Sequence, residues 1–177
     1  LHLEKVTKVS REENLAMISE SVAFCAQHDK RVVYDAEHFF DAWRDDPGYA
    51  LECLRAAIDA GAENVALCDT NGSSLPHEIA EATAAVVKGL DGVEGASVAI
   101  HTHNDAECAV ANAIAAVRAG ATVVQGTVNG YGERTGNCNL ISILPALQLK
   151  LGYDCVAPDR LQRLTETAHL VDEICNV

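Results

Sequence analysis

The sequence predicts an α/β fold in which parallel strands alternate with helices. Four short runs rich in β-branched residues start at intervals of about 25 to 33 residues, and helical patterns fill the gaps between them. This spacing is typical of βαβ crossovers, because a parallel connection uses a helix to return the chain to the same end of the sheet. Two helix-to-strand joints, DAGA at 59–62 and RAGA at 118–121, resemble each other and favour repeated units such as those of a (β/α) barrel.

The four predicted strands have apolar residues at neighbouring positions rather than in strict alternation. This pattern is typical of strands that are covered on both faces. The predicted strands are 31–34, 64–68, 97–101 and 122–125.

Capping residues set the ends of the predicted helices. Asp46 is a good N-cap before Pro47, and Gly61 ends the helix that follows. Ser74 is predicted to cap the next helix, which has Pro76 in its first turn. Asn104 or Asp105 is predicted to cap a third. Further helices are expected over about 12–28, over 140–151, and from Pro158 onward.

The length of 177 residues suits one unit, and we expect a single partial barrel domain over 1–177. A complete (β/α)8 barrel usually takes about 250 residues. Four strands account for half of one, so the chain is either a smaller open sheet or a piece of a longer protein.

Charge and cysteine content limit the partners and the cellular compartment that we expect for the protein. The chain has 13 Lys and Arg against 26 Asp and Glu, a net charge of −13, which argues against nucleic acid or an anionic membrane surface as a partner. No apolar stretch approaches the length of a membrane span. Seven cysteines without a C-x-x-C pair indicate free, mostly buried thiols in a reducing, cytoplasmic compartment.

Polar clusters follow all four strands, where functional groups of parallel α/β proteins gather. The sharpest is His101-Thr102-His103. Residues at i and i+2 of an extended segment point to the same side, so the two imidazoles can share one divalent cation such as Mn²⁺, Mg²⁺, Zn²⁺ or Co²⁺. The alternative is that His101 ends a buried strand and bonds to backbone while His103 faces solvent.

The other clusters supply candidate acid–base and binding groups. Glu37 and Asp35 follow the first strand and suit acid–base work, or they are solvated loop carboxylates. Thr70 can donate its hydroxyl to a substrate oxygen, although Asp-Thr-Asn-Gly also makes a good turn.

The segment 129–137 contains three glycines and suits close approach of backbone to a ligand, a weak signal taken alone. Within it Asn137 can offer an amide oxygen to a metal ion. Glu133 and Arg134 either contribute directly to chemistry or form an ion pair that fixes the loop.

Four segments together carry a resemblance to a known family: YDAEHFFDAW, LCDTNG, HTHNDAECAVAN and GTVNGYGERTGNCNL. The chain resembles the acyl-CoA-dependent group of citramalate, 2-isopropylmalate and homocitrate synthases and hydroxymethylglutaryl-CoA lyase. The resemblance runs through nearly all of the chain, and YDAEHFFDAW and NGYGERTGNCNL look closest to the citramalate synthase branch.

The resemblance implies the carboxyl-terminal half of a (β/α)8 TIM barrel with a divalent metal ion at its rim. It implies that His101, His103 and Asn137 serve the metal, that Glu37 is catalytic, and that Thr70 contacts the 2-oxo acid carboxylate. Glu133 and Arg134 lie in the matching glycine-rich segment and are candidate substrate-binding residues. The family's acidic ligand lies in an Arg-Asp motif at the end of its first strand. The one Arg-Asp pair in this chain, Arg44-Asp45, does not end a predicted strand.

The implied reaction is a Claisen-type condensation of acetyl-CoA with a 2-oxo acid, pyruvate for a citramalate synthase, in branched-chain amino-acid biosynthesis. The chain alone is expected to be inactive, because the acidic ligand is absent from it. Three alternatives stay open: 2-isopropylmalate or homocitrate synthesis, a lyase, and a silent half-barrel that pairs with a second copy through its sheet edges.

Overall fold

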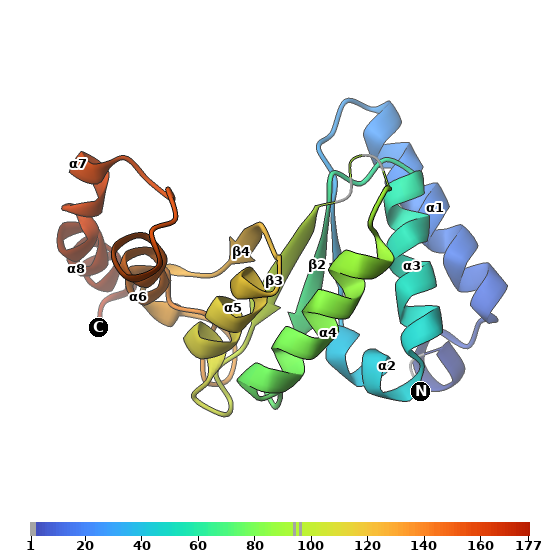
Figure 1. Cartoon of the computed structure of the whole chain (residues 1–177), viewed down its shortest axis with the longest axis horizontal. Helices are drawn as coiled ribbons and strands as arrows, with labels where there is room; N and C mark the ends of the chain where they lie inside the picture. The colour runs from blue at the N-terminus through green and yellow to red at the C-terminus, as the bar shows by residue number, and fades with distance from the viewer. Residues whose placement is uncertain (1–2, 94, 96) are drawn as a thin grey trace.

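The sheet has four parallel strands in the order β1-β2-β3-β4, which confirms the predicted α/β class (Figure 1). The computed structural model describes residues 3–93, 95 and 97–177. The strands are β1 Val33–Ala36, β2 Asn64–Asp69, β3 Val98–Thr102 and β4 Val123–Gln125. The prediction of 31–34 was two residues early, because the β1 ladder begins where Val33 pairs with Asn64 and runs on to Ala36.

Helices follow the strands in the predicted alternation. They are α1 Arg11–Gln27, α2 Phe39–Asp45, α3 Pro47–Asp59, α4 Pro76–Gly89, α5 Ala109–Arg118, α6 Leu140–Pro145, α7 Pro158–Leu161 and α8 Leu164–Cys175. Short helical turns of other pitch are η1 Leu3–Thr7, η2 Val128–Gly130 and η3 Ala146–Lys150. In Figure 1, α3, α4 and α5 lie along the sheet, while α6, α7 and α8 gather beyond β4. The sequence did not predict α2.

The helix ends test the predicted caps. Asp46 caps α3 as predicted, because its Oδ1 accepts a hydrogen bond of 3.0 Å from the Tyr49 amide. The prediction for Ser74 was wrong, since α4 begins after Leu75, whose amide donates to Glu78 at 2.8 Å. The Ser74 hydroxyl instead donates to Asp69 at 2.8 Å, so this residue connects the end of β2 to the start of α4.

The hydrophobic core fills the space between the sheet and the helices. Leu54 of α3, Leu67 of β2 and Ile100 of β3 are fully buried in it. Alternate residues of β2 and β3 face the other side of the sheet, where Ala66 and Ala99 are also buried. The two central strands are therefore covered on both faces, as predicted.

The same prediction was wrong for the outer strands. Val33 of β1 is 52% exposed and Val123 of β4 is 42% exposed, because each lies on an edge strand and faces away from the helices. The sheet is nevertheless strongly curved: the Gln125 amide of β4 donates to the Asp35 carboxylate of β1 at 2.8 Å, across the two strands between them.

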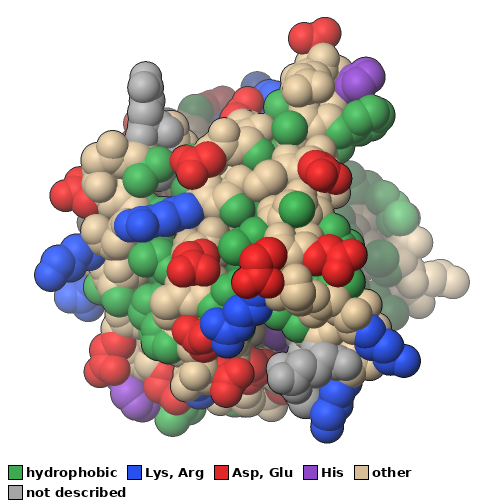
Figure 2. All heavy atoms as spheres, turned by 90° about the vertical axis from the view of Figure 1, so that its right-hand side faces the viewer, with side chains coloured by type: hydrophobic (Ala, Val, Ile, Leu, Met, Phe, Trp, Pro, Cys, Tyr) green, Lys and Arg blue, Asp and Glu red, His purple; other side chains and the backbone are tan. Residues whose placement is uncertain are grey.

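The described surface mixes acidic, basic and hydrophobic side chains, as the face in Figure 2 shows. Among the described residues, no helix combines the length and the apolar character that a bilayer crossing requires. All seven cysteines are free, as predicted, but the expectation that most are buried was wrong. Only Cys68 and Cys138 are buried, because Cys25, Cys155 and Cys175 lie on helix faces or loops that the core does not reach.

Replacing Ile100 with alanine should lower the free energy of unfolding by about 2–5 kcal/mol, because it removes buried methyl groups and leaves a cavity. Urea unfolding followed by circular dichroism measures the change. The matched control is Val33→Ala on the exposed edge strand, which should change the free energy by less than about 0.5 kcal/mol. Equal effects of the two substitutions would contradict this placement of the core.

Candidate functional site

Two histidines lie side by side at the carboxyl end of β3. The rings of His101 and His103 have their centroids 4.8 Å apart and are tilted by 45°. The register that pairs Cys68 with His101 and Asp69 with Thr102 brings the end of β2 to the same edge. The prediction that both rings lie on one side of the chain is confirmed, and the alternative with His103 in solvent is wrong because that residue is 6% exposed.

Each imidazole is held through its Nδ1 atom. His103 Nδ1 lies 3.0 Å from the Asp69 carbonyl oxygen, and His101 Nδ1 lies 2.7 Å from Gln125 Oε1. Both oxygens can only accept, so both Nδ1 atoms carry the hydrogen. In the neutral rings the Nε2 atoms then hold the lone pairs, which is the arrangement of metal-binding histidines whose other nitrogen is oriented by a hydrogen bond.

The Asn137 amide completes this cluster. Its Nδ2 lies 3.4 Å from His101 Nε2, and its Oδ1 is buried with no hydrogen-bond partner among the described residues. A half-turn of the amide about its Cβ–Cγ bond would place Oδ1 near His101 Nε2 instead. Two imidazole nitrogens and an unpartnered amide oxygen are donors that fit a divalent cation such as Mn²⁺.

The glycine at 132 allows Asn137 to take this position. A Cβ atom at Gly132 would collide with Asn137 Oδ1. The glycine-rich segment is therefore needed for close approach of the loop to the amide, as its composition indicates.

The acidic part of a metal site is not assembled in this region. Across residues 3–93, 95 and 97–177, no group of three or more His, Cys, Asp and Glu side chains is arranged to hold a metal ion. The nearest carboxylate on the glycine-rich loop is Glu133, whose Oε1 lies 3.9 Å from His103 Nε2.

Glu37 and Thr70 form a second cluster, at the ends of β1 and β2. The Thr70 hydroxyl donates to Glu37 Oε2 at 2.8 Å and accepts from the His38 amide at 2.7 Å. Glu37 is exposed and Thr70 is half-buried. The Thr70 hydroxyl, predicted to bind a substrate, is thus already hydrogen-bonded to Glu37, the predicted acid or base.

Arg134 connects this second cluster to the glycine-rich loop. Its guanidinium forms two hydrogen bonds of 3.0 Å with the Asp105 carboxylate and one of 2.7 Å with the Thr70 carbonyl oxygen. The guanidinium lowers the pKa of Asp105. The predicted pair with Glu133 also exists, with Arg134 Nη1 3.5 Å from Glu133 Oε1, but Asp105 is the closer partner.

The structure therefore joins all seven candidate residues in one chain of contacts along the edge of the sheet. The order is Glu37, Thr70, Arg134, Glu133, His103, His101 and Asn137. Sequence reasoning missed Gln125 and Asp105 as their partners. Gln125 is the last residue of a strand, and that position was the available signal for it.

The glycine-rich loop is also held from the carboxyl-terminal side. The Asn129 amide donates to the Asp172 carboxylate of α8, and the Tyr131 hydroxyl donates to the same oxygen at 2.7 Å. The bond to the carboxylate raises the pKa of Tyr131 to about 12. The C-terminal helix thus fixes the loop that carries Glu133 and Asn137.

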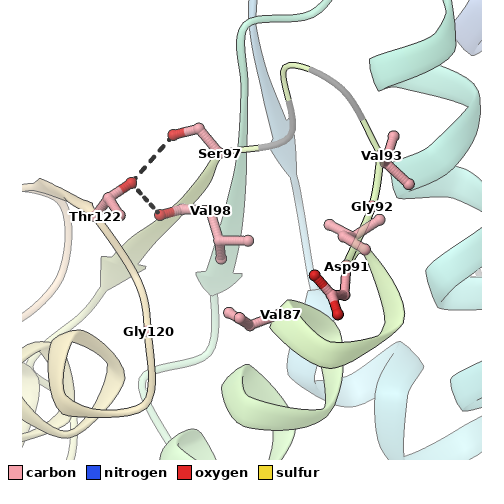
Figure 3. Close-up of a pocket in the computed structure, with 9 residues that line it drawn as sticks. Val87, Asp91, Gly92, Val93, Ser97, Val98, Gly120 and Thr122 are labelled. Atoms are coloured by element: carbon pink, nitrogen blue, oxygen red, sulfur yellow. Dashed lines mark hydrogen bonds between the residues drawn. The ribbon is translucent and has the colours of Figure 1, made fainter.

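Two hollows lie near the sheet. One of about 310 Å³ adjoins the cluster and is lined by Asn104, Asn129, Asn137 and Asn139 among others. The other, of about 360 Å³, lies at the opposite end of the sheet, where β3 and β4 begin (Figure 3). There Thr122 bonds to the Ser97 hydroxyl and to the Val98 carbonyl oxygen. This second hollow therefore lies away from the candidate residues, which are at the carboxyl ends of the strands.

Asp69 is the last residue of β2, and it is buried, with 2% of its surface exposed. Its Oδ1 accepts from Ser74, while its Oδ2 has no hydrogen-bond partner among the described residues. Burial raises the pKa of this carboxyl, and the hydrogen bonds from Ser74 oppose the rise.

Comparison with known proteins identifies the family and the fold of the chain. The profile of the HMGL-like family matches residues 1–171, and the chain belongs to this family. The solved structure of HMG-CoA lyase from Bacillus subtilis has a TM-score of 0.77 and 19% identity over 97% of this chain and 58% of that chain. The fold is accordingly the carboxyl-terminal half of a (β/α)8 barrel.

Two relatives point to a particular branch of the family. An (R)-citramalate synthase of Synechocystis is 51% identical and one of Aquifex aeolicus is 52% identical, each over the whole of this chain. Their identity confirms the resemblance to the citramalate synthase branch. The chain spans 33% of the length of each of these relatives.

Replacing Asp69 with asparagine should stabilise the protein relative to the parent at neutral pH, and the difference should grow with pH. The raised pKa means that the folded parent holds its proton more tightly than the unfolded chain, so the parent loses stability as pH rises through the folded pKa. Urea unfolding at several values between about pH 4 and pH 8 measures the difference. A difference that does not vary with pH would contradict the assignment.

Proposed function

We propose that this chain carries part of the active site of an acyltransferase that condenses acetyl-CoA with a 2-oxo acid. The proposed reaction forms citramalate from pyruvate, in the synthesis of branched-chain amino acids. The observation that carries the proposal is that the His101 and His103 rings lie 4.8 Å apart, with the Asn137 amide 3.4 Å from His101 Nε2. The hydrogen-bonded pair of Thr70 and Glu37 lies at the carboxyl ends of two neighbouring strands. Identity of 51–52% to two (R)-citramalate synthases supports the choice of substrate.

His101, His103 and Asn137 would hold a divalent ion, which can be Mn²⁺, Mg²⁺, Zn²⁺ or Co²⁺. An ion bound there would act as a Lewis acid that polarises the ketone of the 2-oxo acid. The hydrogen bonds that both Nδ1 atoms donate orient the two rings for this task before any ligand arrives.

Thr70 and Glu37 act together in the proposed mechanism. The Thr70 hydroxyl has one hydrogen to donate, and in the structure it donates to Glu37. A substrate carboxylate that takes this hydrogen bond would release Glu37, which can then position water or move a proton during the reaction. Binding of the 2-oxo acid would thus free the carboxylate needed for the later steps.

The proposed reaction has two stages, a condensation and a hydrolysis. The methyl group of acetyl-CoA loses a proton to a base, its carbon forms a bond with the ketone carbon, and the ketone oxygen gains a proton. Water then cleaves the thioester and CoA leaves. Arg134 and Glu133 would border the substrates from the glycine-rich loop, where Asp105 fixes the guanidinium.

The 177 residues would form a single partial barrel within a longer cytoplasmic protein, because the citramalate synthases that match them are three times as long. The family resemblance assigns one metal ligand to an acidic residue in an Arg-Asp motif that no strand of this chain carries. We therefore propose that the chain alone does not catalyse the condensation. The exposed edge residues Val33 and Val123 support pairing with another copy or with the rest of a barrel.

Mn²⁺ should bind to this chain, and replacing both His101 and His103 with alanine should weaken binding at least about 10-fold, because both nitrogen ligands are lost. Isothermal titration calorimetry measures the affinity, and paramagnetic broadening of the imidazole resonances locates the ion. The matched control is His169→Ala on α8, an exposed histidine in another part of the fold. Unchanged affinity in the double variant would refute the metal site.

A chimera should form citramalate from acetyl-CoA and pyruvate when this chain replaces the matching segment of the Aquifex aeolicus enzyme. Glu37→Gln in the chimera should lower kcat by about 10²–10⁴-fold, because the amide cannot exchange the proton, whereas Mn²⁺ affinity should stay the same. Mass spectrometry detects the product, and Glu20→Gln on the exposed side of α1 is the control. A folded chimera that makes no citramalate would contradict the substrate assignment.

A further inference from the structure

Hydrogen bonds connect three side chains in a line across the carboxyl ends of the strands: Asp35 of β1, Gln125 of β4 and His101 of β3. His101 Nδ1 lies 2.7 Å from Gln125 Oε1, and Gln125 Nε2 lies 2.8 Å from Asp35 Oδ1. The three residues come from β3, β4 and β1, so the line depends on the curvature of the sheet. The proposed function gives Gln125 and Asp35 no contact with a substrate.

The direction of each hydrogen bond in this line follows from the residue at its outer end. An ionised aspartate can only accept, so Gln125 must turn its NH₂ group toward Asp35. The amide oxygen of Gln125 then faces His101 and can also only accept. His101 must in turn place its hydrogen on Nδ1, and its Nε2 is left with the lone pair.

We propose that Gln125 is a positioning residue that fixes the tautomer of His101, and that Asp35 fixes the orientation of Gln125. This inference rests on the proposed metal site, because its consequence is that Nε2 faces the cluster ready to bind a cation. His103 reaches the same state by a different route, since its Nδ1 donates to the Asp69 carbonyl oxygen. A side-chain substitution does not remove a backbone carbonyl. Substitution can therefore test the partner of His101, which is a side chain, but not the partner of His103.

The test measures the tautomer directly in the metal-free protein. Two-dimensional ¹H–¹⁵N spectra that correlate the ring nitrogens with carbon-bound hydrogens distinguish protonated from unprotonated nitrogen. The spectra are recorded at about pH 8.5, because the pKa of imidazole in a model peptide is about 6.5. The His101→Ala spectrum assigns the signals. The parent should show a protonated Nδ1 and an unprotonated Nε2 at His101.

Gln125→Met keeps the size of the side chain and removes both hydrogen bonds, and Asp35→Asn removes the group that orients the amide. Both variants should populate the other tautomer of His101 and weaken Mn²⁺ binding, by about 10- to 100-fold for Gln125→Met. The double variant Asp35→Asn with Gln125→Glu should rescue both properties. In it, position 125 offers an acceptor to His101 and position 35 supplies the NH₂ donor, while the net charge stays the same.

The outcomes separate this inference from the proposed function. A parent that binds Mn²⁺ but carries its His101 hydrogen on Nε2 would overturn the inference and leave the metal site in place. A parent with the Nδ1 hydrogen that binds no Mn²⁺ would support the tautomer assignment and refute the metal site. A His101 tautomer that is unchanged in both single variants would overturn the inference, and so would failure of the double variant to restore it.

Discussion

The register between β2 and β3 is the constraint on which the site depends. Because Cys68 pairs with His101 and Asp69 with Thr102, the end of one strand supplies the carbonyl that holds the imidazole following the other. A shift of one residue would turn His101 and His103 to the opposite face of the sheet. The buried side chains of Leu67 and Ile100 fix that register, because each strand must keep its large residues toward the helices.

Curvature is the second constraint, and it acts through polar rather than apolar contacts. Asp35 and Gln125 belong to the two outer strands, yet they form a hydrogen bond across the sheet. That bond lies on the face where Val33 and Val123 are exposed. Gln125, which joins the two outer strands through this bond, is also the hydrogen-bond partner of His101, since its Oε1 lies 2.7 Å from His101 Nδ1.

Much of the fold and part of the site follow from the sequence, because they depend on local signals. Strand spacing predicted the parallel sheet, and the i, i+2 spacing of His101 and His103 predicted rings on one side. The missing parts depend on tertiary contacts. Ser74 has the composition of a cap but bonds to Asp69, and Arg134 bonds to Asp105 more closely than to its neighbour Glu133. The bond between Gln125 and Asp35 joins residues 90 positions apart, which no local pattern reveals.

The contacts of Asp172 carry a consequence for any change at the far end of the chain. This one carboxylate receives hydrogen bonds from Asn129 and Tyr131, so α8 and the glycine-rich loop form a single mechanical unit. Together with the bond from Asn129 to the Ala168 carbonyl oxygen, three hydrogen bonds connect α8 to the segment that presents Asn137, so a displacement of α8 would act on that segment. Leu170 and Ile174 of α8 are both largely exposed, so they offer apolar surface through which another molecule could displace this helix.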